Sequence, residues 1–242
     1  MRLHNFFIEQ KIGEAKSVSV DDADLLHQLK NVFRLEKGDE IVLLDNSGFQ
    51  YRCQVELLSK NEGSFEVLEV AENAIKPARE IYLYVSMIKK DNFEWILEKA
   101  TEIGVSHFAP IISGRSVKIN FNHDRGLKIV KEASEQSGRG KLPELRQIIS
   151  FDKALDEVGR NEIPAIAFHL EEGLMEAADF ISQKLKKQAE VSKIAIFIGP
   201  EGGWSDTEIE QFKKHDVNIL SLGDATLRAE TAAIVASTLF LL

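Results

Sequence analysis

Residues 193–204 read KIAIFIGPEGGW, in which an apolar, strand-like run passes into three glycines, a proline and a glutamate. Ser205-Asp206-Thr207-Glu208 follows as a capping box, so the pattern predicts a strand, a stiff loop and a helix that starts at Ser205. Glycines at such a turn let backbone amides approach a ligand closely. Neither a G-x-G-x-x-G dinucleotide fingerprint nor a P-loop is present. On this pattern alone, a ligand loop and an ordinary tight turn are both open.

A second unusual strand end stands at residues 222–232, LGDATLRAETA. The strand ends at Leu222 and a helix begins near Ala229, which puts Arg228 at a helix start, where the dipole favours anions. A cation placed against that preference indicates a function, whereas Glu230 suits the first helical turn for structural reasons alone. The helix continues to the last residue and is apolar on nearly all faces, so the core or a second subunit has to cover it.

From residue 81 onward, strand-like and helix-like segments alternate, which is typical of a parallel α/β sheet. We expect strands at 81–88, 107–112, 145–149, 164–169, 193–198 and 217–222, and helices at 91–103, 124–139, 151–158, 173–189, 205–214 and 229–242. Asp91, followed three residues later by Glu94, is the expected cap of the first helix, and Gly104 fits its C-terminal end. Both unusual loops follow strands, and ligands bind beyond the carboxyl ends of strands in such sheets.

The first seventy residues favour a small β-barrel or sandwich instead. Five mainly apolar residues alternate with polar ones at the period of a half-buried strand: Phe49, Tyr51, Cys53, Val55 and Leu57. Residues 41–44 and 65–70 supply flanking strands, and turn-forming residues separate the three. Asp21 or Asp22 can cap one helix that runs to about Phe33.

Residues 72–77 have no periodicity and are interpreted as a linker. At roughly 150 residues per domain, a chain of 242 residues suits one large domain, or a medium domain with a small one. We therefore predict a β-barrel at residues 1–72 and an α/β domain at residues 77–242.

The composition excludes several classes of protein. Apolar residues make up 44% and charged residues 29%, which excludes disordered and low-complexity chains. No apolar run reaches the roughly 18 residues of a membrane helix, and the first residues lack the apolar core of a signal peptide. The single cysteine, Cys53, cannot form an internal disulfide, which favours the reducing cytoplasm. The six histidines show no metal-ligand spacing, so we expect no metal.

The net charge of -9 argues weakly against a polyanionic partner, but its distribution is uneven. Residues 114–146 hold eight basic and four acidic residues, a local excess of four positive charges. A basic patch on an acidic protein is compatible with docking on RNA, although a solvated helix face is the plainer interpretation.

Six motifs in a fixed order give the chain a strong resemblance to the 16S rRNA uridine-N3 methyltransferases, the RsmE family of the SPOUT superfamily. The two loops above resemble the family's G-P-E-G-G-[FW] and L-G-x-x-x-L-R-x-E-T-A motifs. The other matching segments are His27 with Val32-Phe33-Arg34 and Gly38-Asp39, the run from Lys89 to Val105, Arg115-Ser116-Val117, and the run from Glu132 to Arg139. The sequence departs from the family pattern at Gly114, at Ala225 and at Gln28.

The resemblance implies a PUA-like barrel followed by a SPOUT methyltransferase domain with a trefoil knot. It implies that S-adenosylmethionine (SAM) is bound in the knot, that the substrate is N3 of a uridine in 16S rRNA of the small ribosomal subunit, and that the active protein is a homodimer. A homodimer would also give the apolar terminal helix a partner.

The resemblance also implies roles for particular residues. Arg228, Glu135 and Glu201 are the catalytic candidates: Arg228 for charge that develops on a uracil carbonyl oxygen, and the two glutamates as proton acceptors. The candidates for cofactor binding are His169, Leu170, Gly199, Glu201, Gly202, Leu222, Gly223 and Leu227. The candidates for RNA binding are Arg2, Arg34, Lys89, Arg115 and Arg139.

Other functions remain open at this point. A SPOUT ribose 2′-O-methyltransferase would share the same motifs. A protein that binds SAM or RNA without catalysis is compatible with the departures at Gly114 and Ala225. A Rossmann-type dehydrogenase fits poorly, because no G-x-G-x-x-G follows any strand.

Overall fold

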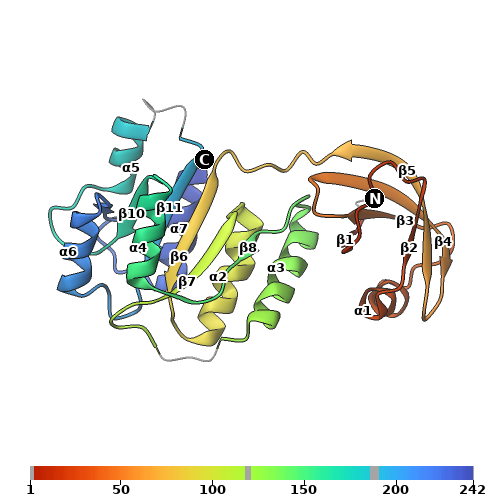
Figure 1. Cartoon of the computed structure of the whole chain (residues 1–242), viewed down its shortest axis with the longest axis horizontal. Coiled ribbons are helices and arrows are strands. Elements are labelled where there is room, and N and C mark those ends of the chain that lie inside the picture. The colour runs from red at the N-terminus through yellow and green to blue at the C-terminus, as the bar shows by residue number, and fades with distance from the viewer. Residues whose placement is uncertain (1–2, 118–120, 186–190, 242) are drawn as a thin grey trace. The chain divides into compact units, whose positions relative to one another are not determined.

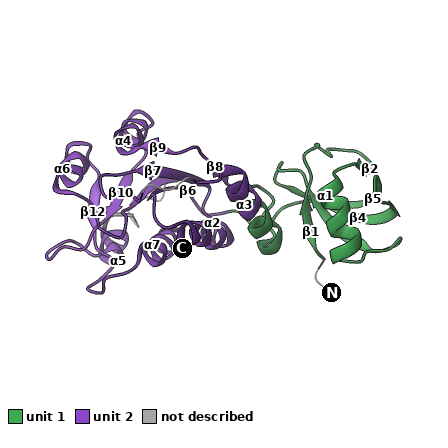
Figure 2. Cartoon of the chain, turned by 90° about the horizontal axis from the view of Figure 1, so that it is seen from below, with its two compact units in different colours: residues 1–76, 131–142 green, residues 77–130, 143–242 purple. Residues whose placement is uncertain are grey.

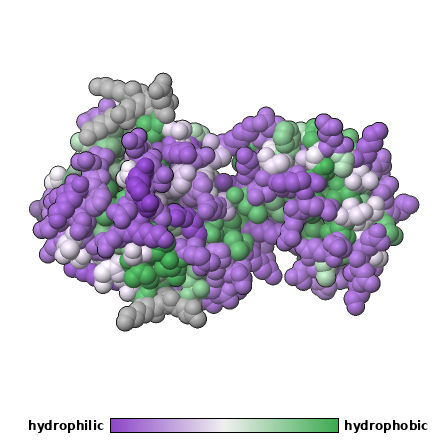
Figure 3. Space-filling view, in the orientation of Figure 1, coloured by the Kyte–Doolittle hydropathy of each residue, from purple (hydrophilic) through white to green (hydrophobic). Residues whose placement is uncertain are grey.

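The computed structural model describes residues 3–117, 121–185 and 191–241. It divides into two compact units, residues 1–76 with 131–142 and residues 77–130 with 143–242, shown in different colours in Figure 2. Apolar side chains form separate cores in the two units, and the surface seen in Figure 3 is mainly hydrophilic with small hydrophobic patches. Among the described residues, no helix is long and apolar enough to span a membrane.

The first unit is a curled five-stranded sheet in the order β1-β3-β4-β5-β2 (Figure 1). Its strands are β1 (Asn5–Phe7), β2 (Ser17–Val20), β3 (Glu40–Leu44), β4 (Phe49–Leu58) and β5 (Gly63–Glu72). The alternation predicted for β4 is confirmed at its centre, where Tyr51, Cys53 and Val55 are buried and their neighbours are not, and is wrong at both ends, where Phe49 and Leu57 are exposed. Burial raises the pKa of the Cys53 thiol to about 11, which leaves it unreactive.

The predicted helix of this unit is capped by Asp22, whose carboxylate accepts hydrogen bonds from the amides of Asp24 and Leu25. It consists of α1 (Ala23–His27) followed by a π-helical turn, η1 (Gln28–Val32). The tight turn predicted at residues 45–48 is held by Asp45, which accepts from the amides of Ile12 and Ser47. The short strands β1 and β2 were not predicted.

The second unit is built on a parallel sheet in the order β12-β10-β11-β6-β7-β8, with β9 paired to β7. Its strands are β6 (Glu80–Ser86), β7 (His107–Ile112), β8 (Glu144–Leu145), β9 (Ile149–Ser150), β10 (Ala165–Phe168), β11 (Lys193–Ile198) and β12 (Asn218–Leu220). The single strand predicted at residues 145–149 is wrong, because the segment pairs with β7 only at its two ends.

Helices cover both faces of this sheet (Figure 1). They are α2 (Lys90–Ile103), α4 (Phe151–Arg160), α5 (Ala177–Phe180) with the π-helical turn η2 (Ile181–Leu185), α6 (Asp206–Lys214) and α7 (Ala229–Leu241). Helix α3 (His123–Ser137) begins in the second unit and ends in the first. Residues of α2, α5 and α7 share one core with the sheet, and residues of α4 and α6 share the other. Successive residues of β11 alternate between the two cores, as a strand buried on both faces must.

The structure tests the residues predicted at three helix ends, the start of α6 and both ends of α2. The capping box of α6 is confirmed, since the Ser205 side chain accepts from the Glu208 amide and the Glu208 carboxylate accepts from the Ser205 amide. Asp91 is not the cap of α2, because that helix already begins at Lys90, after Lys89. Gly104 ends α2 with a φ of 117°, in the left-handed region that favours glycine.

The apolar terminal helix packs within its own unit. One face of α7 is buried against α2, β6 and β11 through Ala233, Ala236 and Phe240, while Ile234 and Leu239 are partly exposed. The core therefore supplies the cover for that face, one of the two alternatives that the sequence left open.

We expect Phe240→Ala to lower the free energy of unfolding of the second unit by about 3–5 kcal/mol. The Phe240 side chain is fully buried and lies beside Phe168, so truncation leaves a cavity in the core. Both tryptophans, Trp95 and Trp204, belong to this unit, so their fluorescence during urea unfolding reports on it. Leu127→Ala, at an exposed position, is the control and should change stability by less than about 0.5 kcal/mol.

Candidate active site

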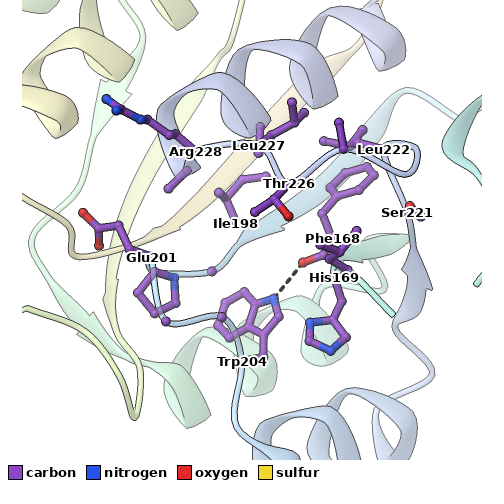
Figure 4. Close-up of a pocket in the computed structure, with 18 of the residues that line it drawn as sticks. Phe168, His169, Ile198, Glu201, Trp204, Ser221, Leu222, Thr226, Leu227 and Arg228 are labelled. Atoms are coloured by element: carbon purple, nitrogen blue, oxygen red, sulfur yellow. Dashed lines mark hydrogen bonds between the residues drawn. The ribbon is translucent and has the colours of Figure 1, made fainter. Parts of the chain in front are cut away.

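The glycine-rich loop, residues 199–204, and the loop at residues 222–228 face each other across one cavity of about 460 Å³ (Figure 4). Three segments form it, and each follows the carboxyl end of a strand: β10, β11 and β12. All eight residues predicted to bind a cofactor line this cavity: His169, Leu170, Gly199, Glu201, Gly202, Leu222, Gly223 and Leu227. The volume lies within the range of roughly 300–1,000 Å³ that small-molecule sites occupy.

The glycine-rich loop is held in place by Trp204. Its indole Nε1 donates a 3.0 Å hydrogen bond to the carbonyl oxygen of Phe168, at the end of the neighbouring strand β10. Trp204 is only 2% exposed, and the position that a Cβ of Gly199 would occupy lies 3.1 Å from its ring. A side chain at position 199 would therefore require the ring or the loop to shift.

Within the same loop, the Gly203 amide donates a 2.8 Å hydrogen bond to the carbonyl oxygen of Pro200. This turn places Gly203 at a φ of 68°, which other residues adopt only with strain. The facing loop is closed by Ser221, whose hydroxyl accepts from the Gly223 amide and donates to the Gly223 carbonyl oxygen. Both walls of the cavity are thus fixed by short-range hydrogen bonds.

The inner walls are mainly apolar, with side chains from the strand ends and from α7: Phe168, Ile198, Leu222, Leu227 and Ala232. Such walls suit a planar or aliphatic ligand, while polar contacts come from the backbone of the two loops. Sequence reasoning gave no role to Phe168 or Trp204. The sequence does carry one sign that Trp204 matters, because it is an aromatic residue directly after Gly202 and Gly203.

Two charged side chains stand at one end of the cavity, Glu201 and Arg228 (Figure 4). The Arg228 side chain is 83% exposed, and its Nη1 lies 4.0 Å from Oε1 of Glu230. An exposed pair at that distance contributes little to stability. Arg228 therefore points a positive charge into solvent at the mouth of the cavity, which fits a role toward an external partner.

Glu135, the third catalytic candidate, does not line this cavity. It belongs to the first unit and borders a second cavity there, of about 420 Å³. Its Oε1 accepts a 2.8 Å hydrogen bond from the Phe7 amide, and burial raises the pKa of the carboxyl group. The structure thus shows Glu135 joining the end of α3 to strand β1.

The five candidates for RNA binding fall in different surroundings. Arg2 lies outside the described residues, and Arg34 and Lys89 are exposed. Arg139 is only 5% exposed, so its side chain offers little surface for RNA, and burial lowers the pKa of its guanidinium to about 10. Nη1 of Arg115 donates to two carbonyl oxygens of the glycine-rich loop.

No group of three or more His, Cys, Asp or Glu side chains within the described parts of the chain is arranged to hold a metal ion. The polar groups at the cavity are backbone amides and carbonyls and the side chains of one arginine, one glutamate, one histidine, one serine and one threonine. Such a set suits an organic ligand better than a metal ion.

Comparison with known proteins agrees with the geometry. Residues 75–241 match the family described as an RNA methyltransferase domain, and residues 20–68 match the RNA methyltransferase PUA domain. Ribosomal RNA small subunit methyltransferase E of Bacillus subtilis is 32% identical over 97% of this chain and 94% of its own length. The crystal structure of the Neisseria gonorrhoeae enzyme of that name, bound to S-adenosyl methionine, is 25% identical, with a TM-score of 0.87 over 98% of this chain and 95% of that chain.

The fold and these matches define the class of protein: an α/β RNA methyltransferase domain preceded by a PUA-like barrel, as the sequence analysis predicted. Within that class, the chain belongs to the ribosomal RNA small subunit methyltransferase E family.

We expect Gly203→Ala to lower the stability of the second unit by about 1–2 kcal/mol, because alanine adopts the left-handed conformation only with strain. Gly159→Ala is the matched control, since it lies in α4 with open space around it and should leave stability unchanged or slightly raised. Urea unfolding followed by tryptophan fluorescence measures both. Equal effects of the two substitutions would contradict the strain at Gly203.

Proposed function

We propose that this protein transfers the methyl group of SAM to N3 of a uridine in the ribosomal RNA of the small subunit. The observation that carries the proposal is the single cavity formed by the two motif loops, with Arg228 and Glu201 together at its mouth. The names of the relatives, which are ribosomal RNA small subunit methyltransferases, support the substrate.

The cavity fits the cofactor in size and in the character of its walls. An adenosine needs flat apolar walls and backbone hydrogen-bonding groups, and the strand ends and the two loops supply both. Gly199 leaves room for the Trp204 ring that packs against the loop, and Gly202 and Gly223 bring the backbone to the surface of the cavity. When bound, the sulfonium of SAM supplies an electrophilic methyl group.

The residues at the mouth would act on the uracil. The N3–H of uracil is weakly acidic, and its removal places negative charge on the neighbouring carbonyl oxygens. The Arg228 guanidinium would stabilise that charge as a preorganised donor. The Glu201 carboxylate, exposed at the same end of the cavity, would accept the proton. Alignment of the base with the methyl group would supply much of the remaining rate.

The other candidates would act away from the reacting atoms. Arg34 on the barrel and Lys89 before α2 would contact the phosphate backbone, a contribution that weakens as salt rises. Glu135 would serve the fold of the first unit through its bond to the Phe7 amide. A homodimer would cover the partly exposed apolar residues of α7, and the site of action would be the cytoplasm, where ribosomal subunits are assembled.

Arg228→Ala should lower the rate of methyl transfer roughly 100- to 1,000-fold, the usual effect of removing one preorganised donor. Affinity for SAM should change little, because the guanidinium faces solvent at the mouth of the cavity. The measurement uses labelled SAM and small ribosomal subunits that lack native modifications, followed by nuclease digestion and mass spectrometry of the methylated nucleoside.

Arg160→Ala is the control, an exposed arginine on α4 outside both cavities, and should transfer at the unmodified rate. Formation of 3-methyluridine, lost in Arg228→Ala, supports the proposal. A 2′-O-methylated product would show a ribose methyltransferase instead. SAM binding without transfer to either subunits or bare rRNA would show a protein without this catalytic activity.

A further inference from the structure

Both central residues of the turn after β7, residues 113–116, donate hydrogen bonds to the segment that follows β11: Arg115 to the glycine-rich loop, and the Gly114 amide to Glu208 in the first turn of α6. The turn is rigid in itself, because the Ser113 amide donates to the Ser116 hydroxyl and the Ser116 amide donates to the Ser113 carbonyl oxygen. A rigid turn can hold a neighbouring loop in a fixed position.

The first tie is the Glu208 carboxylate, which is only 7% exposed. One oxygen accepts a 2.8 Å hydrogen bond from the Gly114 amide. The other accepts from the amide and the hydroxyl of Ser205, each at 2.8 Å. Both oxygens therefore face donors from two different segments, so the carboxylate bridges the turn and the end of the loop.

The second tie is the Arg115 guanidinium. Its Nη1 donates to the carbonyl oxygen of Gly202 at 2.7 Å and to that of Trp204 at 3.2 Å. Arg115 does not line the cavity, so it holds the loop from outside. Its Cδ also lies 3.3 Å from the place that a Cβ of Gly202 would occupy, which shows how closely the side chain follows the loop.

We propose that Arg115 and Glu208 are positioning residues for cofactor binding: they fix the backbone of residues 202–205, which forms one wall of the SAM cavity. Arg115 then acts on SAM affinity rather than as the RNA contact that the sequence suggested. The inference rests on the proposed function for the identity of the ligand, whereas the restraint of the loop follows from the hydrogen bonds alone.

A role of Arg115 in contacting RNA and a role in positioning the loop predict different effects of its substitution on the affinities for SAM and RNA. An arginine that contacts phosphate contributes to RNA affinity and to its salt dependence, and lysine replaces it well. An arginine that donates to two carbonyl oxygens from one nitrogen depends on its reach and its planar head, so lysine replaces it only in part. Glu208→Gln tests the first tie, because an amide NH₂ would face N–H donors where the carboxylate oxygen accepts.

The experiment measures SAM affinity by calorimetry, RNA affinity against salt concentration, and the separate KM values for SAM and RNA. Amide hydrogen exchange of residues 199–205 is followed in the SAM-free protein. The variants are Arg115→Ala, Arg115→Lys and Glu208→Gln, with Arg160→Ala as the exposed control. Tryptophan fluorescence confirms that each variant is folded.

We expect Arg115→Ala and Glu208→Gln to raise the Kd for SAM roughly tenfold to a hundredfold, the effect of losing one or two charge-assisted hydrogen bonds. Arg115→Lys should fall between Arg115→Ala and the unmodified protein. Exchange should rise in residues 199–205, while the KM for RNA and the salt slope stay unchanged.

Unchanged SAM affinity in Arg115→Ala, together with weaker RNA binding and a smaller salt slope, would overturn the proposal and make Arg115 an RNA contact. Unchanged exchange of the loop would overturn the restraint itself. If the unmodified protein binds no SAM, the proposed function fails, and the exchange measurement still decides whether the two residues restrain the loop.

Discussion

The parallel pairing of β10 with β11 and with β12 is the constraint on which the rest of the structure depends. Phe168 pairs with Ile198 on one side and with Leu220 on the other, so all three strands end at one level of the sheet. Parallel strands direct their carboxyl ends to the same edge, and the segments that follow must meet there. Residues more than fifty positions apart in the chain thereby surround one cavity.

The site then divides its tasks between buried and exposed groups. The walls are held by buried and partly buried contacts, such as the Trp204 indole on the Phe168 carbonyl oxygen and the Glu208 carboxylate between two backbone segments. Buried hydrogen bonds of this kind are costly to break, which keeps the cavity in one shape. The charged groups Glu201 and Arg228 stand outside this framework, where a large substrate can reach them.

Local patterns predicted most of the elements. The alternation at the centre of β4, the alternating strands and helices of the second unit, the capping box of α6 and the glycine end of α2 depend on residues close in sequence, and the structure confirms them. The strands that the sequence did not predict correctly have one feature in common. Strands β1 and β2 are short and are defined by pairing with β3 and β5, and β8 and β9 are defined by pairing with β7. A segment of two to four residues carries too little periodicity to show such pairing.

The sequence by itself determined which segments fold locally, which two loops interrupt the regular pattern, and which family the chain resembles. Only the tertiary structure decided what the charged side chains contact. Glu135 bonds to the Phe7 amide 128 positions away, Arg115 donates to the loop 87 and 89 positions away, and Arg139 is buried. The physical reason is that burial and hydrogen bonding between distant segments arise only when the chain packs. The sequence alone does not show whether a charged side chain will contact solvent, RNA or a backbone carbonyl group.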